Sequence, residues 1–93
     1  MTLLLKQIDY FLAVVDNGSF TKAAEKCGVS QSAISQQIGA LENKLDTKLL
    51  DRHNRTFTLT KAGEYFYESA TVIRDQVNEM LMKTIAIGRE ATE

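Results

Sequence analysis

The apolar residues of this 93-residue chain recur with a helical period along nearly its whole length, and only short segments break that period. Apolar side chains spaced i, i+3, i+4, i+7 form one face of a helix. Two breaks, at residues 17–19 and 28–30, pair a glycine with a following serine. Glycine tolerates the left-handed conformation of a helix end, and serine caps the next helix. The chain is therefore restricted to a few helices joined by tight turns.

Three helices are predicted before residue 50. The first ends at Asn17-Gly18, and its apolar face comprises Leu4, Leu5, Ile8, Phe11, Leu12 and Val15. The second is short, begins after Ser19 and ends at Gly28. Its side chains expected to face the core are Phe20, Ala23, Ala24 and Cys27. The third begins after its N-cap Ser30. Its predicted buried stripe comprises Ile34, Ile38, Leu41 and Leu45.

After Leu49-Leu50 the period changes, and residues 51–53 and 56–59 are typical of two short strands with Asn54-Arg55 at the turn. Thr60 is expected to cap a last helix that reaches about Gly88, about 28 residues and on the order of 40 Å long. The apolar spacing alternates between four and three residues, as in a heptad seam. The seam comprises Phe66, Ala70, Ile73, Val77, Met80, Thr84 and Ile87.

The element order predicts a mainly α fold: a winged helix-turn-helix of three helices and a two-stranded wing over residues 1–60, then a long linker helix over 61–93. A chain this short cannot cover so long a helix along its full length. Residues 77–87 would leave an apolar stripe exposed, which indicates a partner. We therefore expect a homodimer through this helix. The candidate dimerisation residues are Phe66, Ile73, Val77, Met80, Leu81, Thr84 and Ile87. The aromatic residues 65–67 are expected to dock on the first helix.

The net charge of −1 hides an uneven distribution. Residues 19–61 carry seven basic and four acidic side chains, net +3, whereas residues 62–93 carry three basic and six acidic ones, net −3. Such asymmetry is typical of a surface that faces a polyanion, although a solvated surface could show it by chance. The outer face of the third helix is small, polar and uncharged, and it includes Ser32, Gln36, Gly39, Ala40 and Asn43. Short donors and acceptors of this kind suit base edges in the major groove of DNA.

Several linked blocks resemble the N-terminal DNA-binding domain of LysR-type transcriptional regulators. They are GSFTKAAE at residues 18–25, VSQSAISQQI at 29–38, Leu41-Glu42, and LTKAG at 59–63. The resemblance covers essentially the whole chain. It implies a bacterial, cytoplasmic and nucleoid-associated regulator that binds double-stranded DNA in a sequence-specific manner. It also implies that the effector-binding domain, and with it any small-molecule effector, lies outside these residues.

The resemblance assigns groove-reading roles to Gln31, Ser32, Ser35 and Gln36 on the third helix. Thr21 and Lys22 match positions that contact the DNA backbone, and Arg52 and Arg55 match wing arginines, with the tip residue expected in the minor groove. Ser30, at the start of the third helix, completes the candidate set. Ser32 stands where the family usually has proline, and Gln36 stands where arginine is common. Gly39 and Ala40 replace frequent Arg or Lys residues, so fewer phosphate contacts than usual are expected.

The sequence offers no pattern typical of a metal site or a catalytic site. His53 and the single cysteine, Cys27, fall on different predicted elements, so neither a metal site nor a nucleophile pair is expected. Glu42 and Asp46 are expected on solvated helix surface. Neither an enzyme activity nor a cofactor is predicted, and no apolar run approaches the about 18 residues of a membrane span. The competing function is a winged-helix protein-interaction or assembly module without specific DNA binding.

Overall fold

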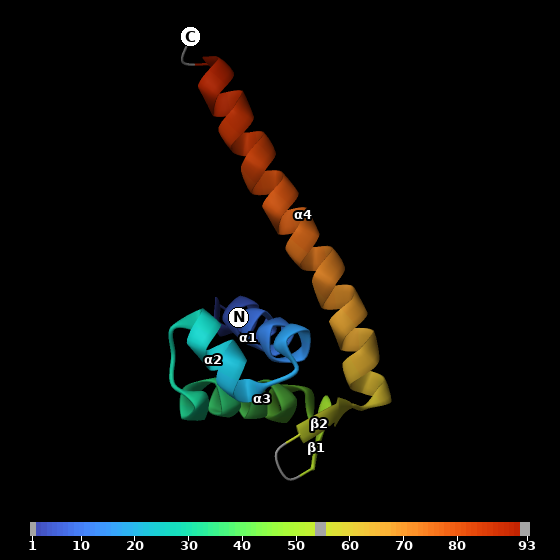
Figure 1. Ribbon diagram of the computed structural model, residues 1–93. Coiled ribbons are helices and arrows are strands. Elements are labelled where there is room, and N and C mark those ends of the chain that lie inside the picture. The colour runs from blue at the N-terminus through green and yellow to red at the C-terminus, as the bar shows by residue number, and fades with distance from the viewer. Residues whose placement is uncertain (1, 54–55, 92–93) are drawn as a thin grey trace.

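The computed structural model describes residues 2–53 and 56–91, and its elements follow the predicted order. They are α1 (Thr2–Asn17), α2 (Phe20–Cys27), α3 (Gln31–Leu45), β1 (Leu50–His53), β2 (Thr56–Leu59) and α4 (Lys61–Ala91). Figure 1 shows α1, α2 and α3 clustered together, the β1–β2 wing beside α3, and α4 running away as one long helix. The predicted winged helix-turn-helix with a long terminal helix is confirmed. β1 begins one residue earlier than expected, and α4 continues past Gly88.

The predicted caps define the helix starts. The Ser19 hydroxyl accepts from the backbone N–H of Lys22 at 3.1 Å, and the Ser30 hydroxyl accepts from that of Ala33 at 3.0 Å. At the start of α4, the Thr60 hydroxyl accepts from the N–H of Gly63 at 3.0 Å. Each bond satisfies a first-turn donor that has no partner inside its helix. The turn between α2 and α3 is therefore only three residues long, and Gly28 takes the left-handed conformation there, with φ 69°.

The apolar faces of α1, α2 and α3 meet in one core. Phe11, Val14, Ile34, Ile38 and Leu41 have no exposed surface. The prediction that Leu45 is buried is wrong, because 41% of that residue is exposed. Leu45 is the last residue of α3, and the chain turns away at Asp46, which is left-handed with φ 50°. The buried stripe of α3 therefore ends at Leu41.

The start of α4 is anchored on the segment that precedes the wing. The backbone N–H of Thr60 donates to the carbonyl of Leu49 at 3.0 Å, and the Thr60 hydroxyl donates to the carbonyl of Lys48 at 2.7 Å. β1 and β2 pair antiparallel, with Leu50 opposite Leu59 and Arg52 opposite Phe57. Because both ends of the hairpin are tied in this way, the wing projects from a fixed base beside α3.

Within the described residues, the packing contacts of α4 with the rest of the chain are concentrated toward its N-terminal end. Phe66 packs edge-on against Phe11 with ring centres 5.2 Å apart, and Ala70 is buried. From residue 75 to residue 91 every residue of α4 is exposed. The molecule is accordingly elongated, with extents of 56 × 25 × 22 Å. The structure thus presents a compact head and a long helix that projects from it.

Candidate nucleic-acid interface

The outer side of α3 gathers the four side chains predicted to read a groove. Gln31, Ser32 and Gln36 are exposed, Ser35 is partly exposed, and together these four line one shallow hollow. None of them carries a charge. Glutamine and serine side chains offer both donors and acceptors. This surface can therefore form directional hydrogen bonds, and its lack of charge means that it is neither repelled by nor strongly attracted to phosphate groups.

The beginning of α2 lies next to this surface. The Thr21 hydroxyl donates to the Gln31 side-chain carbonyl at 3.1 Å, which links the first turns of α2 and α3. Lys22 is exposed beside it. Ser30 is also exposed, although its hydroxyl is already used as the cap of α3. The structure therefore brings Thr21 next to Gln31, and Lys22 and Ser30 are the exposed neighbours of these two residues along the chain.

The wing reaches the same surface through Arg52. Its Nη1 donates to the Ser35 hydroxyl at 2.9 Å, and its guanidinium carbon lies 4.6 Å from the centre of the Phe20 ring. A second hollow continues from the first, and it is lined by Ser19, Phe20, Thr21, Gln31, Ser35, Arg52, Thr56 and Phe57. Arg55, the other predicted wing residue, lies outside the described residues.

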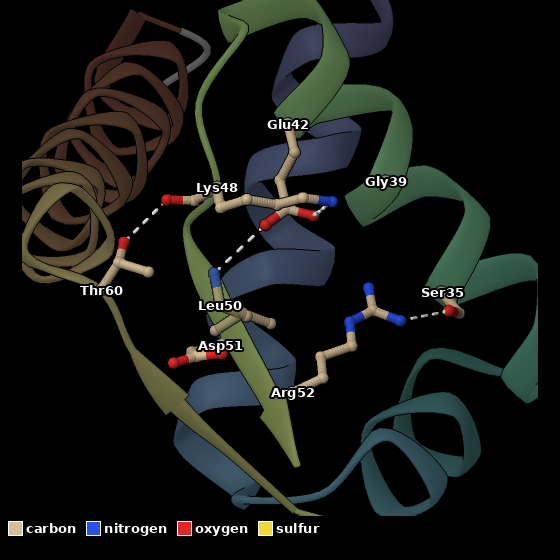
Figure 2. A pocket seen from close by; sticks show the side chains of 8 residues that line it. All are labelled: Ser35, Gly39, Glu42, Lys48, Leu50, Asp51, Arg52 and Thr60. Atoms are coloured by element: carbon tan, nitrogen blue, oxygen red, sulfur yellow. Dashed lines mark hydrogen bonds and ion pairs between the residues drawn. The ribbon is translucent and has the colours of Figure 1, made fainter. Parts of the chain in front are cut away.

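A further hollow of about 500 Å³ separates α3 from β1. Figure 2 shows its lining, with Arg52 pointing toward Ser35 and with Lys48 above the strand. Gly39 also lines it, and no atom lies within 4 Å of where a Cβ would stand on this residue. The space beside Gly39 is therefore open to an occupant from outside the chain.

Glu42 is not on solvated surface, and that expectation is wrong. Its side chain is 4% exposed, and Oε2 accepts from the backbone N–H of Leu49 at 2.7 Å. It also accepts from that of Leu50 at 3.2 Å, as Figure 2 shows. Lys48 Nζ lies 4.0 Å from Oε1. The carboxylate satisfies two backbone donors where the chain enters β1, so it fixes the wing to α3. Asp46 is exposed as expected, and it also ends α3.

Gln7 is a buried polar residue that the sequence analysis did not single out. It is 2% exposed, its Nε2 donates to the Gln37 carbonyl at 3.3 Å, and its Oε1 accepts from Lys44 Nζ at 3.5 Å. Its position on the apolar side of α1, one residue before Ile8, is the only signal in the sequence. It joins α1 to the inner side of α3 and so supports the reading helix from behind.

The α4 residues predicted to dimerise fall into two groups. Phe66 is committed to its contact with Phe11 within the chain. The other six are exposed: Ile73, Val77, Met80, Leu81, Thr84 and Ile87. Ile73 and Val77 also line an apolar hollow against Leu5 and Ile8 of α1. An apolar stripe of this length on an exposed helix face is the form of a helix-pairing surface.

The aromatic residues at the start of α4 behave differently from one another. Phe66 and Tyr67 dock on α1 as predicted, whereas Tyr65 is 73% exposed, so its predicted docking is wrong. The Tyr67 hydroxyl donates to Asp16, and Arg74 Nη1 donates to the other oxygen of that carboxylate at 3.2 Å. The hydrogen bond to Asp16 raises the pKa of Tyr67 above its ordinary value, and burial and the carboxylate charge act in the same direction. Tyr65 lies two residues before Tyr67 and faces solvent.

The described residues contain no cluster of three or more His, Cys, Asp or Glu side chains placed to hold a metal ion. Cys27 is partly buried against the core, as a small apolar residue would be. Within the described ranges, no helix is both long enough and apolar enough to cross a membrane.

The family profile described as "Bacterial regulatory helix-turn-helix protein, lysR family" matches residues 5–64. The chain belongs to the LysR family. The match begins in α1 and ends in the first turn of α4, so it takes in α2, α3 and the wing. The resemblance recognised from the sequence motifs is thereby confirmed.

Among LysR relatives, the transcriptional regulator BenM of Acinetobacter baylyi is 40% identical over 84 residues, which are 90% of this chain and 28% of BenM. The transcriptional regulator BudR of Raoultella terrigena is 44% identical over 85 residues, 91% of this chain and 29% of BudR. The chain therefore spans less than a third of the length of these curated LysR regulators.

Solved structures of LysR proteins have the same architecture. The BenM DBD in its complex with catB site 1 DNA superposes with a TM-score of 0.86 at 39% identity, covering 90% of this chain and 93% of that one. The CbnR DBD in its DNA complex gives 0.82 at 36% identity, covering 90% and 97%. Both similar chains were therefore solved with DNA.

Proposed function

We propose that this chain is the DNA-binding part of a bacterial LysR-type transcriptional regulator and that it binds double-stranded DNA in a sequence-specific manner. The observation that carries the proposal is the uncharged, exposed outer side of α3, where Gln31, Ser32, Ser35 and Gln36 lie together. The BenM and CbnR chains, which resemble this one over nine-tenths of its length, support it because their structures contain DNA.

In the proposed complex, α3 lies in the major groove with its N-terminal end foremost. Gln36 is suited to bidentate hydrogen bonds with adenine, and Ser32 and Ser35 can donate or accept. Gln31 is oriented by its bond from Thr21. The start of a helix attracts phosphate through its dipole and free N–H groups, which fits Ser30 at the edge of the contact surface.

Charged side chains around α3 supply the phosphate contacts. Lys22 is exposed at the start of α2, and Arg52 on β1 lines the hollow next to the reading surface. Arg55 is expected to enter the minor groove, where A·T-rich narrowing strengthens the negative potential. With so few cations, the affinity of a single head is low, and the binding free energy depends on pairing two heads.

The second copy is held through α4. The exposed stripe from Ile73 to Ile87 is proposed to pair with the same stripe of another copy, which places two heads on one duplex. The target is then a two-fold symmetric site whose half-sites lie about one or two helical turns apart on one face. We place the functional boundary between residues 60 and 61, with the DNA-binding unit before it and the dimerisation helix after it.

The whole protein's regulatory activity is also a proposal, since the LysR relatives extend well beyond the matched part. By analogy with LysR-type regulators, a small-molecule effector would act on a part of the protein outside this chain. The protein is then expected to work in the bacterial cytoplasm, on the nucleoid.

A gel shift of the 93-residue chain tests the proposal directly. Mixed-sequence duplexes of about 30 bp, long enough for two half-sites, are used at low salt. A shifted complex that weakens steeply as salt rises is expected. A chain that is folded by circular dichroism and shifts no duplex would instead be a protein-interaction module.

A further inference from the structure

Arg52 is held by two other elements of its own chain. Its Nη1 donates to Ser35 of α3 at 2.9 Å, and its guanidinium lies over the ring of Phe20, the first residue of α2, at 4.6 Å. Figure 2 shows the side chain extended from β1 toward Ser35. A guanidinium is planar, so stacking on a ring and donating in its own plane are compatible at the same time.

Phe20 also contacts the second strand of the wing. Its ring stands edge-on to Phe57 with centres 5.7 Å apart, and Phe57 is the residue paired with Arg52 across the hairpin. One aromatic ring therefore receives a cation from β1 and an aromatic edge from β2. These contacts join α2, α3 and both strands. We call the four residues that make them the wing clamp: Phe20, Ser35, Arg52 and Phe57.

The wing needs such a restraint. A two-stranded hairpin is marginally stable by itself, and this one is fixed at its base by Glu42 and by Thr60. The wing clamp is the contact set farther along the strands, at the pair before the last one toward the tip. The position of the two strands relative to α3 thus depends on the wing clamp.

We propose that Arg52 is a positioning residue, which together with Phe20 fixes the wing strands against α3 so that the wing and the α3 side chains reach adjacent grooves at once. This inference rests on the proposed DNA binding. It departs from the simpler role of Arg52 as a phosphate contact, because lysine would keep the charge needed for a phosphate contact but would lose the planar stacking and the directed bond to Ser35.

Binding of the 93-residue chain to a duplex enriched from a random pool separates the two roles. As a positioning residue, Arg52→Lys weakens binding about as much as Arg52→Ala, on the order of tenfold, which is the size of one stacked cation and one hydrogen bond. Both variants show the same dependence of the binding constant on salt, because a displaced wing affects the two alike whether or not residue 52 is charged. Phe20→Leu weakens binding to the same extent, whereas Phe20→Tyr keeps the ring and binds like the wild type. The Phe20→Leu/Arg52→Ala double variant binds no more weakly than either single variant.

Three results would overturn the inference. Arg52→Lys could bind like the wild type, Arg52→Ala could have a salt slope lower than that of Arg52→Lys by about 0.9, as expected for one lost phosphate contact, or the effects of the Phe20 and Arg52 changes could be additive. Arg52 is exposed, so its variants are expected to fold, and circular dichroism checks this for each protein. In the free wild type, the Arg52 Nε–H proton should be shifted upfield by the Phe20 ring, and an ordinary shift would contradict the stacking.

Failure of the proposed function looks different. A wild-type chain that enriches no duplex removes DNA binding, and the positioning role falls with it. A wild type that binds well while Arg52→Lys also binds well removes only the positioning role.

Discussion

Gly63 is a glycine whose position leaves no room for a side chain. A Cβ on this residue would lie 2.0 Å from the backbone carbonyl oxygen of Leu49 and 3.2 Å from a methyl group of Leu59. The nearest atom belongs to backbone, which the bond from Thr60 holds in place. Glycine is required here because α4 begins in direct contact with the segment before the wing.

Gly63→Ala is therefore expected to destabilise the protein by at least about 1–3 kcal/mol, the usual cost of overpacking. Urea unfolding followed by circular dichroism measures it. The matched control is Gly88→Ala in the same helix, where nothing lies within 4 Å of the added carbon. That change should stabilise by about 0.5–1 kcal/mol, since alanine is the better helix former. Equal effects of the two changes would contradict the proposed close contact.

Single polar residues were the hardest part of the molecule to predict. Glu42 faces the backbone N–H groups of residues 49 and 50, and backbone donors leave no trace in the pattern of side chains. Gln7 is buried and forms hydrogen bonds with Gln37 and Lys44, which are 30 and 37 residues away along the chain. Neither contact follows from local spacing, because each depends on how the helices pack.

At the scale of elements, local signals were sufficient. Caps at Ser19, Ser30 and Thr60 and the glycine turns predicted the helices to within a few residues, and the change of period after Leu50 predicted the two strands. These signals act over one helical turn, so they can be read from neighbouring residues. The burial of Leu45 was mispredicted since periodicity does not say where the covering elements stop.

The junction between α1 and α4 is stabilised by the Tyr67 hydroxyl, which donates to Asp16. Tyr67→Phe should lower the free energy of unfolding by about 0.5–1.5 kcal/mol near neutral pH, as expected for one net hydrogen bond. Denaturant unfolding measures it. Tyr65→Phe serves as the control, because Tyr65 is 73% exposed and its hydroxyl is expected to contribute little.

The same junction predicts a pH dependence. The folded-state pKa of Tyr67 lies above the ordinary value of 10.0, because the phenol is a donor to Asp16. The stabilising effect is thus fully present below pH 10 and is lost as the pH rises through the folded-state pKa. The difference between wild type and Tyr67→Phe should be constant from neutral pH to about 9 and should shrink above about 10. A difference that persists unchanged into strong alkali would contradict this.

For the whole molecule, the elongated shape and the exposed stripe of α4 predict self-association. Met80→Glu places a carboxylate on the stripe and should convert a dimer into a monomer in sedimentation equilibrium, since burying an unpaired charge is costly. Met82→Glu is the matched control. Met82 is 67% exposed and lies two residues on, which turns it about 200° away from Met80 on the helix.

Equal sedimentation of both variants and the wild type would contradict pairing through this face. The uneven charge, net +3 over residues 19–61 and net −3 over residues 62–93, fits such a division of the molecule. The basic part forms α2, α3 and the wing, and the acidic part forms most of α4.

The candidate site was predicted from the sequence to different degrees. The exposed side of α3 followed from the helical period, and the structure places Gln31, Ser32, Ser35 and Gln36 on one surface. The contacts of Arg52 with Ser35 and Phe20 did not follow, because they join three elements that are separated along the chain. Roles at the level of single bases came only from the family resemblance.

The central claim is that the uncharged side of α3 reads base pairs. Selection from random duplexes, performed with wild type, Gln36→Ala and Lys22→Ala, tests it most directly. Gln36→Ala should lose the preference at one base pair of each half-site, at a cost of about 1–3 kcal/mol for that pair. Lys22→Ala should keep the wild-type preferences and bind every sequence more weakly. Equal weakening on all sequences by Gln36→Ala would contradict the account.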